Sequence, residues 1–282
     1  MINKRNVLNS PRLLELKKKR KRVILNKVVL SLSAIVAIVA CLGYFSRLPN
    51  LNIKEIKVTG NKIVETKDIE SLINEQLSQK YLWLIPKTNI LIYPENKLET
   101  ALSNKFKRLK DLRFSIENNK VLVLAVGERI PKYMWCGDEL VEDDQETCYF
   151  LDNEGYIFDQ APYFSGEVYF KFYGKPEGEY FMPQQFKELV SFIDLLSGIG
   201  LKPAVLYLAP DQDINIFLSK GTGALSRPKI LLKKNADLHN LAENLDTAVS
   251  TDPLMSELKT KYSKLEYIDL RFGNKIYYRF HE

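Results

Sequence analysis

Histidine and cysteine are scarce in this chain of 282 residues, which contains two of the former and three of the latter. The histidines are His239, within a helical pattern, and His281, next to the last residue. No Ser-His-Asp or Cys-His arrangement with all its members in one site can be assembled from them. The glycine-rich segment 221–224 lacks the G-x-x-x-x-G-K-[ST] spacing of a phosphate-binding loop. A carboxylate pair of the glycosidase kind stays open, because acidic residues are numerous.

Acidic residues are nearly missing from the first 27 positions, which hold ten lysines and arginines and only Glu15. This basic arm carries 10 − 1 = +9, so the rest of the chain carries 6 − 9 = −3 of the net +6. A nucleic-acid-binding domain should be basic on its folded face, whereas the bulk here is mildly acidic. We therefore expect no nucleic-acid partner.

Charge is also missing between Lys27 and Arg47, where nineteen residues read VVLSLSAIVAIVACLGYFS. As a helix, residues 28–46 would span about 28 Å, close to the ~30 Å of a hydrocarbon core. The aromatic pair at the far end fits the membrane interface, and the positive-inside rule places the arm, residues 1–27, in the cytoplasm. We expect a single-pass membrane protein whose bulk lies outside the cytoplasm.

Two alternatives exist for this apolar segment. A cleavable signal peptide has a shorter apolar stretch and a cleavage site of small residues. The sequence Ile38-Val39-Ala40-Cys41 is similar to a lipoprotein signal, in which Cys41 would carry the lipid. The length and flanks of the run favour a retained helix, in which Cys41 is one more soft apolar side chain.

The other two cysteines, Cys136 and Cys148, bracket a segment with six acidic residues. The flanking residues read as strands, so the pair would lie at the base of a hairpin, within reach of a disulfide. An oxidising compartment would favour that bond, and two reduced thiols are the alternative. Zinc is not expected from two thiolates without a nearby histidine, and the acids lack the spacing of a calcium loop. We expect a solvated acidic loop and no cofactor.

Residues 47–128 have the pattern of a small unit of order β-α-α-β-β. Residues 55–59 alternate polar and apolar, as a half-buried strand does. Thr66 is expected to cap the first helix, and Pro94 to open the second. Two strands are expected to complete the unit, at 112–116 and 121–126.

Residues 129–282 predict a second domain, a mixed or antiparallel sheet with helices on one face. Pro183 is expected to open one helix, and a helical region at 236–263 is interrupted near Pro253. A run of aromatic residues between 163 and 181 is typical of a sheet core, with glycan binding as the alternative. Strands are expected near 133–136, 148–152, 156–158, 167–172, 204–208, 214–218 and 229–232.

The last two predicted strands, 265–272 and 275–280, are joined by Gly273-Asn274, which is a strong hairpin signal. A strand placed last is a candidate sheet edge, whose unpaired backbone groups can accept another strand. The final strand has two faces, with Ile276, Tyr278 and Phe280 on one and Lys275, Tyr277 and Arg279 on the other.

Four segments resemble, in order, motifs of the FtsQ/DivIB family of bacterial cell-division proteins. They are the first-strand sequence at 53–61, V-x-E-R-x-P at 126–131, L-x-D-x-x-G-x-x-F at 151–158 and Y-x-D-L-R-[YF] at 267–272. The resemblance covers the chain from the basic arm to the C-terminus. It implies a POTRA domain over 47–128 and an FtsQ-type β domain over 129–282.

The resemblance further implies a non-catalytic scaffold of the division septum in the plasma (inner) membrane. The C-terminal region would bind FtsB, which pairs with FtsL, and the POTRA domain would contact septal synthesis proteins. The backbone of residues 275–280 would accept the partner strand. Arg271 would face an acidic partner segment, while Phe272 and Tyr278 would supply apolar anchors. A salt bridge from Arg271 to Asp269 is the structural alternative.

Two other functional classes stay open at this point. POTRA domains also occur in envelope-assembly and export adaptors, and a cell-wall hydrolase could use a carboxylate pair. The chain has no long series of alternating barrel strands, which counts against the first. Nothing in it supplies the usual catalytic context for the second.

Overall fold

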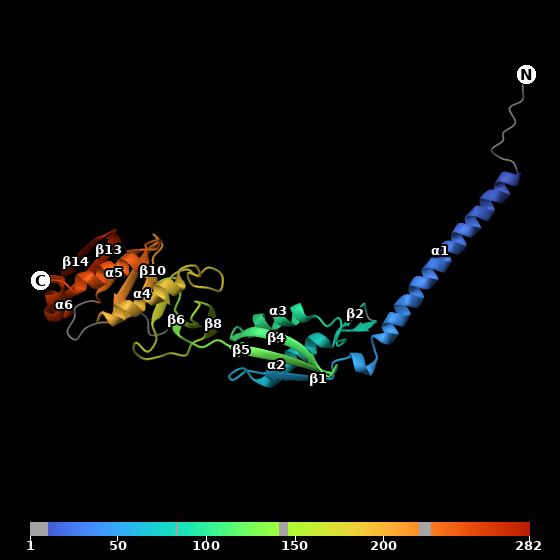
Figure 1. Cartoon of the computed structure of the whole chain (residues 1–282), viewed down its shortest axis with the longest axis horizontal. Helices are drawn as coiled ribbons and strands as arrows, with labels where there is room; N and C mark the ends of the chain where they lie inside the picture. The colour runs from blue at the N-terminus through green and yellow to red at the C-terminus, as the bar shows by residue number, and fades with distance from the viewer. Residues whose placement is uncertain (1–10, 83, 141–145, 220–226) are drawn as a thin grey trace, which may run out of the picture. The chain divides into compact units, whose positions relative to one another are not determined.

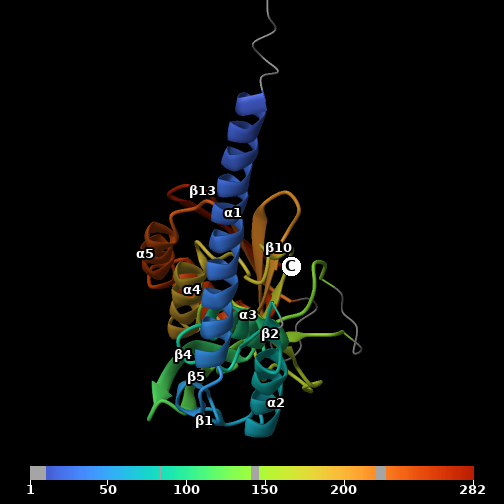
Figure 2. The ribbon, with the colours of Figure 1, turned by 90° about the vertical axis from the view of Figure 1, so that its right-hand side faces the viewer.

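The computed structural model describes residues 11–82, 84–140, 146–219 and 227–282 (Figures 1 and 2). The chain divides into two compact units, Met1–Glu128 and Arg129–Glu282. The fold is mixed α+β, with one long apolar helix at the N-terminus followed by two units that each contain a sheet. The glycine-rich segment 221–224 lies outside the described residues, as does the start of the basic arm, residues 1–10.

The N-terminal helix α1 (Pro11–Phe45) contains the uncharged run that the sequence predicted as helical, except its last residue, Ser46. Among the described residues, it is the one helix that is long and apolar enough to cross a membrane. Most of its described apolar side chains are exposed, and only near its C-terminal end, at Gly43, does another described part of the chain pack against it. This is the expected property of a helix whose surroundings are lipid.

Unit 1 contains a three-stranded sheet of order β1-β5-β4, in which β5 pairs parallel with β1 and antiparallel with β4. Two helices pack against it, because Ile69, Leu98 and Leu122 share one buried core. A short hairpin that the sequence did not predict stands between the helices. The bounds are η2 (Pro49–Leu51), β1 (Glu55–Thr59), α2 (Thr66–Leu77), β2 (Lys80–Tyr81), β3 (Ile85–Pro86), α3 (Glu95–Lys105), β4 (Leu109–Glu117) and β5 (Val121–Glu128).

The start of α2 differs from the prediction. Thr66 is the first helical residue, and Glu65 occupies the capping position without a side-chain hydrogen bond. The Thr66 hydroxyl instead accepts a hydrogen bond from the Asn61 side-chain amide, 3.0 Å away. The expectation that Thr66 caps the helix was therefore wrong, because its side chain serves the preceding turn.

Glu128, at the end of β5, fixes the loop between β1 and α2. Its carboxylate accepts hydrogen bonds from the backbone N–H groups of Lys62, Ile63 and Val64, at 2.8 to 3.0 Å. Burial raises the pKa of Glu128, but these three backbone donors and the charge of Arg108 outweigh it, and the pKa is lowered. The ionised carboxylate thus ties the end of β5 to the loop between β1 and α2.

We expect Glu128→Gln to loosen this loop, because the neutral amide accepts backbone hydrogen bonds less well. Exchange of the amides at 62–64 should accelerate roughly tenfold, equivalent to about 1.4 kcal/mol. Because the folded pKa lies below the ordinary 4.5, the contribution of Glu128 is present above that pH and is lost as pH falls through the folded value. Hydrogen–deuterium exchange of the full chain measures the change. Glu117→Gln, at an exposed acid of the same unit, is the control, and equal rates in both variants would contradict the role of Glu128.

Unit 2 contains a nine-stranded mixed sheet of order β14-β13-β12-β11-β10-β9-β6-β7-β8. The pairs β6-β9, β9-β10 and β12-β13 are parallel, and the remaining five are antiparallel. The strand bounds are β6 (Tyr133–Trp135), β7 (Tyr149–Leu151), β8 (Ile157–Gln160), β9 (Lys171–Tyr173), β10 (Pro203–Leu208), β11 (Asp213–Leu218), β12 (Lys229–Lys233), β13 (Leu265–Phe272) and β14 (Lys275–Phe280).

The main core of unit 2 lies between the sheet and helices α4 and α5. Leu189 of α4 and Leu245 of α5 are fully buried in the same cluster as Ile216 of β11. Pro183 was expected to open the first of these helices, but it lies in the preceding turn, and the helix begins at Phe186 with Gln185 at the capping position. The helical region after residue 236 is interrupted at Pro253, as predicted. The helix bounds are α4 (Phe186–Gly198), α5 (Leu238–Val249), α6 (Leu254–Lys261) and η3 (Tyr262–Lys264).

A second, aromatic-rich core occupies the opposite face of the sheet around β6 to β10. Neighbouring residues of β9 show the alternation, because Phe172 belongs to the main core and Tyr173 to this one. The aromatic run therefore serves mainly as core. Tyr163, with 66% of its surface exposed, is the exception among the described aromatics of that run.

Candidate partner-binding edge

Strand β14 is the last strand in the order of the large sheet, so one of its sides has no strand neighbour among the described residues. It is joined to β13 through Gly273-Asn274, with Phe272 paired to Lys275. Gly273 has a positive φ of 66°, the left-handed conformation that glycine adopts without strain. The tight link fixes the register of β14 against β13, and no described strand pairs with the other side of β14.

The phase of the ladder tells which backbone groups face outward. The His281 N–H donates to the Lys264 carbonyl at 2.7 Å, so residue 281 directs its backbone groups toward β13. Both register shifts between the strands add residues to β13 and leave β14 regular. Since alternate residues of a strand point their backbone groups to opposite sides, residues 276, 278 and 280 direct theirs to the free edge.

The side chains of β14 divide as the sequence predicted. Those of Ile276, Tyr278 and Phe280 pack against the main core, whereas Lys275, Tyr277 and Arg279 are exposed. Burial, then the charge and a hydrogen bond of Glu257, raise the pKa of Tyr278. Tyr278 is therefore half-buried against its own chain, and its role as an apolar anchor for a partner stays a prediction.

An exposed aromatic pair lies at the turn end of the edge. The rings of Phe272 and Tyr277 meet edge to face with centroids 5.3 Å apart. Phe272 is 58% exposed and Tyr277 48% exposed, although both are large apolar side chains. Exposed aromatic pairs are typical anchors of protein interfaces. Tyr277 is therefore the tyrosine of β14 whose ring is exposed, beside that of Phe272.

Arg271 belongs to an ion cluster within the chain. Its guanidinium donates to both carboxylate oxygens of Asp269, at 2.9 and 2.6 Å, and to Asp213 at 2.8 Å. The hydrogen bond from Arg271 lowers the pKa of Asp213. For Asp269, burial raises the pKa, but the side-chain and backbone donors of Arg271 outweigh it and the pKa is lowered. The predicted salt bridge from Arg271 to Asp269 is therefore present, and Asp213 provides a second carboxylate for the same guanidinium.

Asp213 is the member of this cluster that the sequence did not indicate. It lies 58 residues before Arg271, at the start of β11, and β12 runs between the two strands. An acid at the first position of a strand carries no signal of its own. Only the order β11-β12-β13 brings it to Arg271.

Cys136 and Cys148 are joined by a disulfide beside the paired strands β6 and β7. The Glu146 carboxylate approaches both sulfurs and accepts hydrogen bonds from Lys171 and Tyr173. Because bonded sulfurs are not thiolates, this group offers no zinc site in the oxidised state. The acids Glu142, Asp143 and Asp144 of the expected loop lie outside the described residues.

Two predicted motifs meet at the start of unit 2. The Arg129 guanidinium donates to Asp152 at 2.5 Å and lies 3.7 Å above the ring of Tyr156. The other Asp152 oxygen accepts the backbone N–H groups of Glu154 and Tyr156. At Gly155 a Cβ atom would lie 2.8 Å from the Phe181 carbonyl oxygen, so only glycine fits. These residues hold one turn together and leave no open site.

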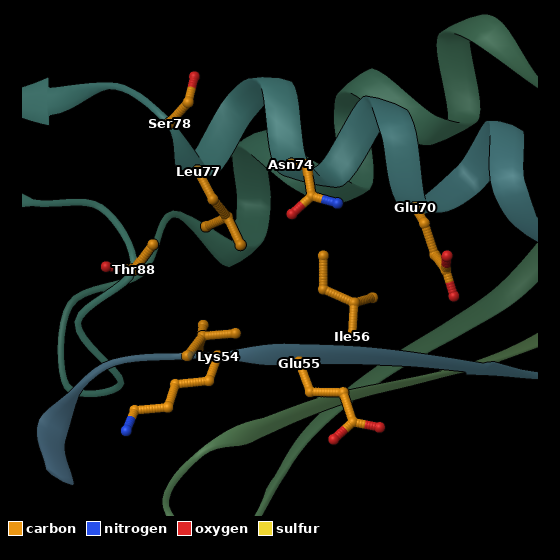
Figure 3. Close-up of a pocket in the computed structure, with 9 residues that line it drawn as sticks. Lys54, Glu55, Ile56, Glu70, Asn74, Leu77, Ser78 and Thr88 are labelled. Atoms are coloured by element: carbon orange, nitrogen blue, oxygen red, sulfur yellow. The ribbon is translucent and has the colours of Figure 1, made fainter. Parts of the chain in front are cut away.

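A groove of 520 Å³ lies in unit 1 between β1 and α2 (Figure 3). Ile56 of β1 and Leu77 of α2 point into it from opposite sides. Glu70, Asn74 and Lys54 surround the apolar floor. This mixture of acidic, basic and amide groups favours no single ligand chemistry.

No protein-family model matches the chain, and a comparison with curated proteins finds no match either.

Proposed function

We propose that this protein is a non-catalytic, membrane-anchored scaffold of the bacterial divisome, of the FtsQ/DivIB type. It binds FtsB/FtsL-like partners through the free edge of β14 and links them to septal peptidoglycan synthesis. The helix α1 holds it in the plasma (inner) membrane, with the basic arm in the cytoplasm and both units outside. The single observation that carries the proposal is the unpaired edge of β14 beside the exposed Phe272–Tyr277 pair.

The order of the parts supports this reading. A helix of membrane-spanning length precedes a β-α-α-β-β unit, which has the element order of a POTRA domain, and a larger sheet ends in the edge strand. The motifs at 126–131, 151–158 and 267–272 each have a structural role, in unit 1, in unit 2 and beside β14 respectively. Glu128 closes the first unit, the Arg129–Asp152 pair opens the second, and Asp269–Arg271 supports the strand next to the edge.

Strand addition fits the chemistry of the edge. The outward N–H and C=O groups of residues 276, 278 and 280 can pair with any extended backbone, which supplies affinity. The aromatic pair and the exposed Lys275 and Arg279 can select the partner's side chains. Confinement of both proteins to one membrane raises their effective concentration, so a short added strand suffices.

The proposal predicts co-purification. Affinity-tagged full-length chain, extracted from its native membranes, is expected to bring FtsB-like and FtsL-like single-pass coiled-coil proteins with it. A similarly tagged, unrelated single-pass protein is the control. Recovery of neither partner would contradict the proposal, and peptidoglycan cleavage by the purified chain would favour the hydrolase alternative.

A further inference from the structure

Four exposed apolar side chains lie in two segments that both hydrogen-bond to the residues following α1. Leu82 is 90% exposed and Leu91 is 75% exposed, and Leu84 and Ile92 are exposed at 40% and 44%. They come from the hairpin β2-β3 and from the loop that follows it. We call Leu82, Leu84, Leu91 and Ile92 the apolar tip. Side chains of this size and kind are rarely left together in water.

Hydrogen bonds join the apolar tip to the residues that follow α1. The Arg47 guanidinium donates to the Leu84 carbonyl from Nε at 3.3 Å and from Nη2 at 3.2 Å. The Asn89 side-chain amide donates to the Ser46 carbonyl at 3.1 Å, and its oxygen accepts the N–H of Leu91. Both parts of the tip are therefore tied to the first two residues beyond the helix.

The contact with Gly43 sets the level of the tip along the helix axis. Gly43 is buried, and a Cβ built on it would lie 3.9 Å from the Leu84 side chain. Gly43 precedes Ser46 by three residues, which is about 4.5 Å along a helix axis. The hairpin thus reaches back alongside the last turn of α1, as β2 does in both views (Figures 1 and 2).

We propose that the apolar tip inserts into the outer interfacial layer of the bilayer and forms a second membrane contact beside α1. The inference rests on the proposed membrane anchor, because a helix that spans the bilayer brings Leu84 to the depth of its own last turn. The occupant is lipid because the tip is continuous with the spanning helix. The groups around it are those of membrane interfaces, with Tyr44 and Phe45 on α1 and the cation Arg47 beside them.

A second contact has a consequence for unit 1. A single helix leaves the attached unit free to tilt about its end, whereas two contacts restrict that tilt. The tip would therefore hold β1 and α2 at a fixed height above the membrane. Partners anchored in the same membrane would then meet unit 1 in one orientation.

Depth measurements on the full chain in lipid nanodiscs of phosphatidylcholine and phosphatidylglycerol test the inference. With Cys41 replaced by alanine and the disulfide kept, a nitroxide is attached at Leu82→Cys or, separately, at Leu91→Cys. Collisions with oxygen, which concentrates in lipid, are compared with collisions with a water-soluble nickel chelate. Ile63→Cys is the matched control, since Ile63 is also apolar and 65% exposed but lies beyond the far end of β1. Val36→Cys reports on α1 itself.

We expect labels at 82 and 91 to lose nickel accessibility and gain oxygen accessibility relative to 63. Equal nickel accessibility at 82, 91 and 63, with 36 protected, would overturn the inference and leave the anchor intact. The same result is expected if the natural occupant of the tip is a partner protein, because the discs contain no partner protein. Nickel accessibility at 36 would overturn the anchor and the inference together.

Discussion

Replacing Tyr278 with proline is expected to weaken capture of the FtsB/FtsL-like partner strongly. The backbone N–H of residue 278 faces the free edge of β14, so proline removes a donor that the partner strand needs and places its ring in the same space. The β13–β14 ladder keeps its own hydrogen bonds, which come from the alternate residues. We expect binding to weaken roughly 100-fold, equivalent to about 2.7 kcal/mol. Co-purification from membranes, quantified by mass spectrometry, measures the loss.

Two control variants separate the backbone effect from the side-chain effect. Tyr278→Leu removes the phenol and its contact with Glu257 but keeps the N–H, so the partner should still bind. Tyr277→Pro removes an inward donor and should loosen the hairpin itself, with faster amide exchange in β13. If Tyr278→Pro retains the partner while β13 stays protected, strand addition at this edge is wrong.

Replacing Tyr277 or Phe272 with alanine would test which partner side chains are selected. These variants do not test whether the partner binds by strand addition. In the proposed complex, the exposed rings of Phe272 and Tyr277 would select the partner's side chains, whereas the edge would supply hydrogen bonds to any strand. The proline variant therefore addresses the mode of binding. An aromatic variant would address only its specificity.

Local patterns predicted the helices and most strands, because each buries one regular face. Residues 55–59, 66–77 and 265–280 have the secondary structure that their periodicity indicated. The pairing order was beyond such reasoning, because a parallel pair such as β12–β13 joins segments more than thirty residues apart. Strand β9 was predicted at 167–172 and occurs at Lys171–Tyr173, since only these residues lie between β6 and β10.

The candidate site was predictable in its backbone and less so in its side chains. A strand placed last in the chain need not lie at a sheet edge. The two-residue turn predicted its pairing with β13, and the sheet order shows that no described strand pairs with its other side. Which of Tyr277 and Tyr278 is exposed depends on where the core lies, and alternation alone does not decide it. From the sequence, Arg271 could be assigned to an acidic partner segment, because nothing indicated that Asp213 lies near it. In the fold, Asp213 of β11 reaches Arg271 of β13 across β12.

Replacing Arg271 with alanine is expected to destabilise unit 2 by about 3 kcal/mol, because it leaves the buried Asp269 without a cation. Asp213 then keeps only the exposed Lys233, whose ammonium lies 3.2 Å from its other oxygen. Asp269 and Asp213 are 6% and 8% exposed, so water replaces the guanidinium poorly. With Trp83 changed to phenylalanine, Trp135 in β6 reports the unfolding of unit 2 in urea. Arg279→Ala is the matched control, since Arg279 pairs with Glu266 at the surface and should contribute at most about 1 kcal/mol. Equal losses in the two variants would contradict the cluster's role.

The loss on removing Arg271 should depend on pH in a defined direction. In the folded protein the pKa values of Asp213 and Asp269 lie below the ordinary 3.8, so their contribution is present above that pH and is lost as pH falls through the folded values. In the alanine variant, protonation instead relieves the buried charge of Asp269, which has lost its cation, while Asp213 still pairs with Lys233. The stability difference should therefore be largest at neutral pH and shrink below about pH 4. A variant that keeps its stability at pH 7 but loses the partner would return Arg271 to the binding surface, because its charge would then matter between chains and not within one.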